Sequence, residues 1–178
     1  MQARIEYAKV APMAMAAMYT LEQYVRQSGL NPSLLELVKL RASQINGCAY
    51  CVDMHTKDAR ARGETEQRLY AVAVWQETPF FTEQERAALA WTEAVTWVRR
   101  RHVPEGVYEL ARRYFGEKEL VDLTMAIIAI NGWNRLAISF RTVPGSYQPA
   151  IEGKKNATAS RAVASIPTQE RSDTRSHS

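Results

Sequence analysis

Two cysteines and a histidine lie close together in the chain, at Cys48, Cys51 and His55. An α-helix turns about 100° per residue, so a helix beginning at or just before Cys48 would place all three side chains on one face. His55 follows Cys51 at the separation at which helical side chains meet. Imidazole is also the side chain best suited to accept a thiol proton near neutral pH. The spacing therefore predicts a base beside a nucleophilic sulfur.

The start of this helix should favour the thiolate form. Asn46 and Gly47 are a turn signal, so the preceding helix should end there and the next should begin at Cys48. Unpaired N–H groups at a helix N-terminus attract negative charge, and thiols in a C-x-x-C arrangement commonly have a pKa below about 8.5. If one sulfur is oxidised to a sulfenic acid, the other can close a disulfide before further oxidation. One turn of helix would then hold a whole redox cycle.

Two other interpretations of the cysteine pair stay open. A C-x-x-C pair can be half of a structural zinc site, which needs four ligands. The chain has no further cysteine, so His102, His177 or a carboxylate would have to complete that site. The cysteines could also be buried and inert.

The stretch that contains Glu36, Asn46-Gly47-Cys48, Cys51 and His55 resembles the motif of the AhpD-like alkylhydroperoxidases, in the carboxymuconolactone decarboxylase superfamily. The core LVKLRASQINGCAYCVDMHT is similar to that of small bacterial members. The resemblance continues through GETEQRLYAVAVWQETPFFTEQERAALAWTEAVT and ELVDLTMAIIAINGWNRLAISFR, and it spans residues 5 to 145.

This resemblance implies an all-α, compact multi-helix bundle that forms a homo-oligomer, a trimer or a hexamer, and reduces hydroperoxides. By position, Cys51 matches the cysteine that becomes the sulfenic acid and Cys48 matches the one that resolves it. His55 and Glu36 match the proton relay. The implied cycle uses an external dithiol reductant, a dihydrolipoyl protein or a thioredoxin-like carrier, and no metal, flavin or haem cofactor. The sequence departs from the pattern at Tyr50, where the best-studied members have a second histidine.

The choice of attacking sulfur depends on which physical effect dominates. Helix-end electrostatics favours Cys48, the first cysteine, whereas adjacency to His55 favours Cys51. We expect Cys51 to attack, because a close base acts on one thiol while the helix end acts on both. Glu36 could orient His55 and stabilise its protonated form, as the third member of a catalytic triad does.

Length, composition and charge limit the possible domain number, binding partners and compartment. A chain of 178 residues with 46% hydrophobic residues suits one globular domain, which we place at residues 1–145. The net charge is only +4, and no stretch interleaves clustered Arg and Lys with aromatic residues, so we expect no nucleic-acid binding. A lone cysteine pair suits a reducing compartment, and we expect a cytoplasmic protein. The apolar run from Val10 to Met18 continues at helical spacing through Val25, which argues against a signal peptide.

The helical pattern predicts the elements that position these residues. We expect a first helix over residues 7–28, a helix opened by Asn31-Pro32 that carries Glu36 to Gln44, and the cysteine helix to Arg62, with Gly63 as its cap. Further helices are expected over 64–76 with Leu69, Val72 and Val74 in the core, after a Thr82–Glu85 capping box, from Pro104 to Phe115, and from Glu117 to Phe140.

The last of these helices is apolar on nearly every side. Asp122, Asn131, Asn134 and Arg135 interrupt it, so we interpret it as a buried core helix and not as a membrane span. Asn131, Trp133 and Asn134 could line the site. Residues 146–178 hold few large apolar side chains, and we expect a disordered tail.

The expected function is therefore that of an antioxidant thiol peroxidase, an oxidoreductase of the alkylhydroperoxidase type. Two alternatives remain: a carboxymuconolactone decarboxylase-like enzyme, and a non-enzymatic redox-sensing scaffold. The cysteine pair argues against the decarboxylase, because those decarboxylases do not depend on a C-x-x-C. Repeated turnover with a reductant would separate an enzyme from a sensor.

Overall fold

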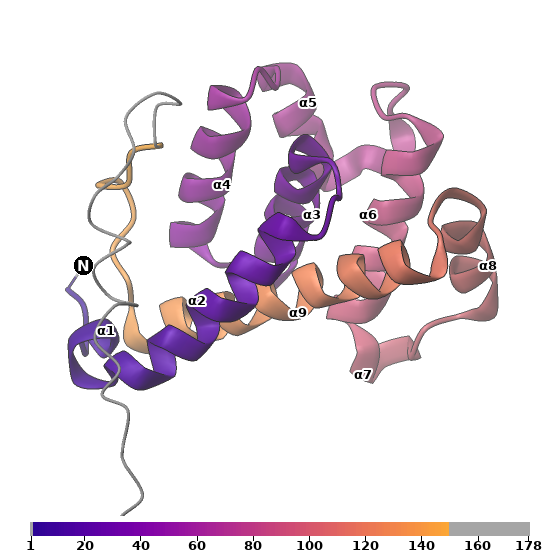
Figure 1. Cartoon of the computed structure of the whole chain (residues 1–178). Helices are drawn as coiled ribbons and strands as arrows, with labels where there is room; N and C mark the ends of the chain where they lie inside the picture. Colours follow the sequence, from indigo (N-terminus) through magenta and orange to yellow (C-terminus); the bar gives the residue numbers. More distant parts are fainter. Residues whose placement is uncertain (1, 150–178) are drawn as a thin grey trace, which may run out of the picture.

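The computed structural model describes residues 2–149, and over that range the chain is helical with no strand, as predicted (Figure 1). Its elements are α1 (Tyr7–Val10), α2 (Pro12–Gln27), α3 (Pro32–Asn46), α4 (Ala49–Ala61), α5 (Glu66–Ala71), the 3₁₀ helix η1 (Val72–Glu77), α6 (Glu83–Thr96), α7 (Val98–Arg101), α8 (Glu105–Tyr114) and α9 (Glu117–Phe140).

Helix α3 is the element around which the others pack. It is buried on nearly every side and contacts α4, α6 and α9. Leu34 and Val38 belong to an apolar cluster shared with α2, α6, α8 and α9, whereas Leu37 and Leu40 belong to a second cluster shared with α4, α5, η1 and α6. Because α3 runs between these two clusters, the carboxylate of Glu36 is held in the interior of the molecule.

Capping residues fix the ends of the helices near the site, as the sequence predicted. The Asn31 side chain accepts a backbone N–H of the first turn of α3 at 2.8 Å, and Pro32 is the first residue of that helix. Gly47 adopts the left-handed conformation, with φ of 70°, and ends α3. Thr82 and Glu85 form the expected capping box at the start of α6.

The prediction of one helix over residues 7–28 is wrong. The helix is interrupted at Ala11, where φ is −131°, and α2 begins afresh at Pro12. Proline has no N–H to donate, and its ring clashes with the carbonyl four residues earlier. The first position of a new helix is where it is tolerated.

The helix predicted over residues 64–76 is also shorter than expected. After α5 the chain tightens into η1, and Val74 leaves helical geometry with φ of −126°. Leu69 and Val72 are buried as predicted, but Val74 is 57% exposed and does not belong to the core.

Helix α9 lies along the base of the molecule, with α2 packed against it (Figure 1). Gly132 allows this approach, because a Cβ there would lie 2.9 Å from the Cε of Met18. One face of α9 is buried, while Val121 and Ile128 on another face are exposed. None of the helices in the described range combines the length and the apolar character needed to cross a membrane.

After α9 the chain turns back and runs along α4, as the orange segment in Figure 1 shows. Gly145 N–H donates to Asp53 at 3.0 Å, and the Lys57 ammonium donates to the carbonyls of Gly145 and Tyr147 at 3.3 and 3.1 Å. The Tyr147 hydroxyl donates to Asp58 at 2.7 Å. We call residues 145–147 the C-terminal strap. Most of the predicted tail, residues 150–178, lies outside the described residues.

Candidate active site

Cys48 and Cys51 open helix α4. Cys48 is the N-cap residue, and its Sγ accepts the backbone N–H of Cys51 at 3.4 Å. Both thiols are free, and both residues are only 1% exposed. They lie in a small apolar cluster between α3, α4 and α9, against which Tyr50 and Trp133 pack as partly buried aromatic side chains. The turn at Gly47 thus delivers the thiol pair to a helix N-terminus that is closed to bulk water.

The two thiols ionise as a pair. A hydrogen bond from the Cys51 thiol lowers the pKa of Cys48 to about 7; burial opposes this, and the N–H groups of Cys51 and Tyr50 and the side chain of Asn134 support it. The hydrogen bond to Cys48, followed by burial and repulsion from Cys48, raises the pKa of Cys51. This second ionisation is suppressed because the first thiolate is already present. Of the two thiols, Cys48 is therefore the one that ionises first.

Glu36 and His55 form a buried pair across α3 and α4. Glu36 Oε2 lies 2.8 Å from His55 Nδ1. Burial would raise the pKa of Glu36, but the hydrogen bond from His55 and the positive charges of His55, Lys39 and Arg62 lower it overall. An ionised carboxylate can only accept, so Nδ1 carries a hydrogen. His55 Nε2 is buried and has no hydrogen-bond partner among residues 2–149.

The four predicted site residues thus come together on two neighbouring helices. Cys51 and His55 lie one turn apart on the buried face of α4, and Glu36 meets His55 from α3. Because His55 Nε2 has no partner in the described part of the chain, no hydrogen bond links the imidazole to either sulfur. The predicted proton transfer between His55 and Cys51 accordingly stays a prediction.

The departure at Tyr50 has a clear chemical consequence. Burial raises the pKa of the Tyr50 phenol, with further contributions from Tyr7, Cys51 and Tyr19. The phenol is therefore neutral near pH 7 and cannot serve as the base that a histidine would provide there.

Other polar residues on the helices of the site have identifiable partners. Three charged residues on α3 and α4 form ion pairs: Lys39 with Glu22, Arg41 with Glu93 at 2.7 Å, and Asp53 with Lys57 at 2.9 Å. Lys39 is buried although it is charged. Of the three possible site-lining residues on α9, Trp133 packs against the cysteine cluster, and the side chain of Asn134 lowers the pKa of both thiols. Asn131 bonds instead to Asn46 and Thr96.

Asp58 and Tyr147 are neighbours of the site that the sequence did not indicate. Burial and the charge of Glu36 raise the pKa of Asp58, and the hydrogen bond from Tyr147 partly offsets them. Asp58 follows His55 at helical spacing, which could have been noticed. Nothing in the sequence points to Tyr147, because it reaches Asp58 only through the turn at Gly145.

A metal centre on the cysteines finds little support in the described residues. Over residues 2–149 the one group of three potential ligands close enough together is Glu36, His55 and Asp58, whose ligand atoms lie within 4.8 Å of one another. This group includes neither cysteine, so it does not complete the zinc site considered above. Glu36 and Asp58 already accept hydrogen bonds from His55 and Tyr147, which stabilise their charges without a cation.

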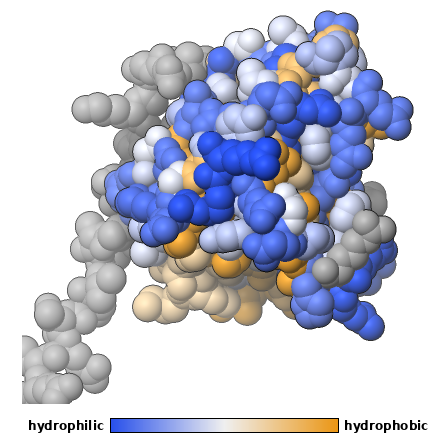
Figure 2. All heavy atoms as spheres, turned by 90° about the vertical axis from the view of Figure 1, so that its right-hand side faces the viewer, coloured by the Kyte–Doolittle hydropathy of each residue, from blue (hydrophilic) through white to orange (hydrophobic). Residues whose placement is uncertain are grey.

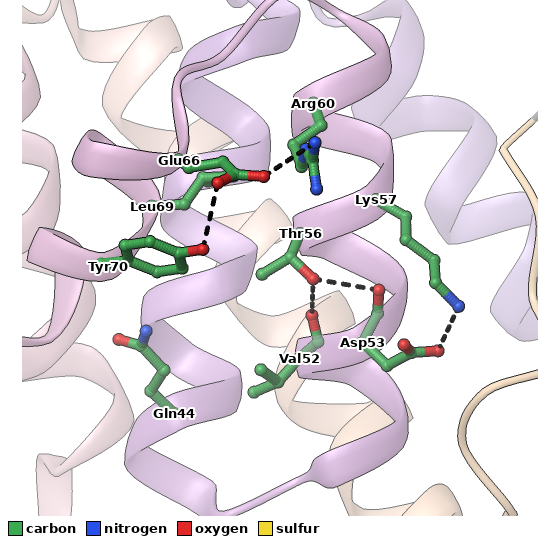
Figure 3. A pocket seen from close by; sticks show the side chains of 9 residues that line it. All are labelled: Gln44, Val52, Asp53, Thr56, Lys57, Arg60, Glu66, Leu69 and Tyr70. Carbon is green, nitrogen blue, oxygen red and sulfur yellow. Dashed lines mark hydrogen bonds and ion pairs between the residues drawn. The ribbon is translucent and has the colours of Figure 1, made fainter.

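A groove of about 440 Å³ lies beside α4 but is separate from this site (Figure 3). Its walls come from α3, α4 and α5, and none of the four predicted site residues lines it. Its charged groups pair with each other, Lys57 with Asp53 at 2.9 Å and Arg60 with Glu66 at 2.8 Å. The groove therefore offers no unpaired charge for a substrate.

Comparison with known proteins finds one matching family and several relatives in bacteria. The model of the carboxymuconolactone decarboxylase family matches residues 12–94. The uncharacterized protein YdfG of Bacillus subtilis is 44% identical over 139 residues, which cover 78% of this chain and 95% of YdfG. The uncharacterized protein YnjA of Escherichia coli is 31% identical over 102 residues, covering 57% of this chain and 56% of YnjA.

Solved structures resemble the whole bundle. An Agrobacterium tumefaciens protein of unknown function, suggested to be the antioxidant defence protein AhpD, is 47% identical; the match covers 82% of this chain and all of that one, with a TM-score of 0.80. The debrominase Bmp8 is 21% identical, with a TM-score of 0.67 and coverage of 76% of this chain and 73% of its own. This second likeness concerns the fold alone.

Proposed function

This chain belongs to the carboxymuconolactone decarboxylase family, and we propose that within it the protein is a thiol peroxidase that reduces hydrogen peroxide or small organic hydroperoxides. The observation that carries the proposal is the pair of free, buried thiols one helical turn apart at the start of α4, where the Cys48 sulfur accepts the backbone N–H of Cys51 at 3.4 Å. Such a pair holds one thiolate near neutral pH and can close a disulfide without moving the helix. The suggested role of the Agrobacterium relative agrees with this chemistry.

The proposed cycle starts by moving the shared proton. Transfer of the Cys51 proton to Cys48 or to His55 Nε2 leaves a thiolate on Cys51. This thiolate attacks the terminal oxygen of the hydroperoxide, the O–O bond breaks, and the alkoxide takes up a proton to leave as an alcohol. Cys48 then attacks the Cys51 sulfenic acid, which releases water and forms the disulfide.

An external dithiol completes the cycle by exchange with the disulfide. Its two thiols supply the two electrons that the peroxide removed, and the site returns to its reduced form. A dihydrolipoyl protein or a thioredoxin-like carrier has the required chemistry. Since both cysteines are 1% exposed, Tyr50 and Trp133 are the side chains that would have to move to admit the reductant.

The first test counts thiols. One equivalent of hydroperoxide is added to the reduced, metal-free protein, and free thiols and intact mass are measured before and after. We expect rapid loss of both thiols and a mass decrease of two hydrogens. Survival of both thiols would overturn the peroxidase proposal.

Single-residue variants then test which sulfur attacks the peroxide, which sulfur closes the disulfide, and whether His55 acts as the base. Cys48→Ser should stop after one oxidation and accumulate a trappable sulfenic acid on Cys51, whereas Cys51→Ser should consume no peroxide. A sulfenic acid found instead on Cys48 would reverse the two roles. His55→Ala should slow oxidation by about 10²-fold or more, the usual scale of general acid–base catalysis. His102→Ala, which changes an exposed histidine outside the site, is the matched control and should retain the normal rate.

A further inference from the structure

A chain of polar side chains connects α9 to α3 beneath the cysteine pair. Asn46 Nδ2 donates to the side-chain oxygens of Asn131 and Asn134, at 2.9 and 2.8 Å. Asn134 Nδ2 in turn donates to the Ser43 hydroxyl at 3.1 Å. Asn134 is completely buried, where an amide without partners would be costly, so these bonds hold it in place.

The orientation of the first amide in this chain is fixed by groups that cannot exchange roles. The Arg135 guanidinium can only donate, and it lies 3.1 Å from Asn131 Oδ1. The Ile127 carbonyl can only accept, and it lies 2.9 Å from Asn131 Nδ2. Asn131 therefore presents its oxygen to Asn46, and Asn46 must donate to it through its NH₂ group.

The same reasoning fixes Asn134. Its oxygen receives the second hydrogen of the Asn46 NH₂ group, so its own NH₂ group must face Ser43 on α3. The Ser43 hydroxyl uses its hydrogen on the Lys39 carbonyl, at 2.7 Å, and can only accept from Asn134. One hydrogen of the Asn134 NH₂ group remains for the sulfurs. The neighbours of Asn134 on the same face of α9, Ile130 and Ala137, pack directly in the cysteine cluster.

We propose that Asn134 is a further catalytic residue, whose amide N–H stabilises the negative charge on the thiol pair and is held toward the sulfurs by Asn46 and Ser43. Asn134 lies beside the pair, because it donates to Ser43, whose backbone carbonyl accepts the Cys48 N–H at 3.0 Å. Its side-chain amide lowers the pKa of both Cys48 and Cys51, so one donor favours the thiolate on either sulfur. It can follow the charge as the proton moves between them. The biological meaning of this role rests on the proposed dithiol cycle, but the role itself concerns thiol ionisation and is tested without peroxide.

The test compares Asn134→Leu with Asn131→Leu in the full-length reduced protein. Both changes replace a buried or half-buried amide on α9 that bonds to Asn46, but of the two only Asn134 lowers the pKa of the thiols. The pH midpoint of thiolate formation is followed by ultraviolet absorbance. Loss of a hydrogen bond to a charged group should raise the midpoint by about one pH unit in Asn134→Leu. Asn131→Leu should give a smaller shift, because Asn134 keeps its bonds to Asn46 and Ser43 when Asn131 is replaced.

Equal midpoints in Asn134→Leu and the unchanged protein, or equal shifts in the two variants, would overturn the proposal. If Asn134→Leu does not fold, the side-chain amide signals of Asn134 are followed by NMR in the unchanged protein. They should move with the thiolate midpoint, and the absence of any movement would overturn the proposal. If the midpoint rises as expected in Asn134→Leu but the unchanged protein consumes no peroxide, the peroxidase proposal fails and the role of Asn134 in thiol ionisation stands.

Discussion

At the scale of single residues, the two thiols have opposite roles in one hydrogen bond. The Cys51 thiol donates and the Cys48 sulfur accepts, so the same contact lowers one pKa and raises the other. Helix-end donors add to this asymmetry, because the backbone N–H groups of Cys51 and Tyr50 both favour the charged form of Cys48. The Cys51 thiol and the helix-end N–H groups together therefore favour ionisation of Cys48, while the predicted attack by Cys51 depends on its proton reaching Cys48 or His55.

This asymmetry makes a signed prediction. In Cys51→Ala the largest stabilising contact of the Cys48 thiolate is lost, so the pKa of Cys48 should rise above about 7. In Cys48→Ala the contact that holds the Cys51 proton is lost, so the pKa of Cys51 should fall. Thiolate exists above the pKa, so alkylation at pH 7 should slow in the first variant. The pH dependence of alkylation measures both shifts, and shifts of the same sign would contradict the hydrogen-bond direction.

Local spacing predicted the residues that share a helix, and long-range packing determined the rest. Cys48, Cys51 and His55 are related by helical periodicity alone, so the sequence could place them on one face. Glu36 was identified from a family resemblance, because its contact with His55 depends on how α3 packs against α4. The orientation of Asn134 depends on side chains from two helices, and no short pattern in the sequence encodes such a network.

At the scale of the elements, the site depends on where α3 ends and α4 begins. Gly47 takes the left-handed conformation immediately before Cys48, and an added Cβ there would meet no atom within 4 Å. The cost of any side chain at this position is thus conformational and not steric. This single residue sets the direction in which the thiol pair enters its helix.

Gly47→Ala should therefore destabilise the protein by about 1 kcal/mol, the usual penalty for a left-handed alanine. The measurement is the free energy of unfolding in denaturant. Gly106→Ala is the control with the opposite sign, because Gly106 lies within α8 at ordinary φ with open space around it. That change should stabilise by about 0.5 kcal/mol or more. A loss of stability at Gly106 and none at Gly47 would contradict this interpretation.

The elements also show where local patterns fail. Capping signals at Asn31, Gly47 and Thr82 were sufficient, since each satisfies backbone groups within its own turn. The α-helix after Gly63 was predicted too long because a local apolar pattern does not distinguish an α-helix from the 3₁₀ helix that replaces it at Val72. At the end of η1, Arg86 of α6 donates to the carbonyls of Trp75, Gln76 and Thr78, and this contact comes from a part of the chain distant from the pattern.

At the scale of the whole molecule, apolar side chains remain exposed on the helices that form its base. Tyr24 on α2 and Val121 and Ile128 on α9 are 46%, 59% and 48% exposed. Figure 2 shows the end that carries α7 and α8, where hydrophilic side chains cover most of the face and hydrophobic ones gather toward its lower edge. In the homo-oligomer that the family resemblance implies, we expect a second copy to pack against this face of α9.

We expect the protein to have the mass of a trimer or a hexamer by light scattering after gel filtration. Val121→Glu and Ile128→Glu together should shift it toward the monomer, because a buried unpaired carboxylate opposes association. Val74→Glu is the matched control, since Val74 is similarly exposed, at 57%, but lies on η1. A monomeric unchanged protein would contradict the predicted oligomer, and dissociation by Val74→Glu alone would place the contact elsewhere.

The use of Cys48 as both the helix cap and a member of the redox pair couples the driving force of the reaction to the fold. The N–H groups that gather on its sulfur stabilise an anion, and a disulfide sulfur carries no such charge. In a closed thermodynamic cycle, whatever stabilises the reduced protein more than the oxidised one raises the reduction potential of the disulfide. The disulfide should therefore be a ready oxidant, which a mild dithiol donor can return to the thiol state.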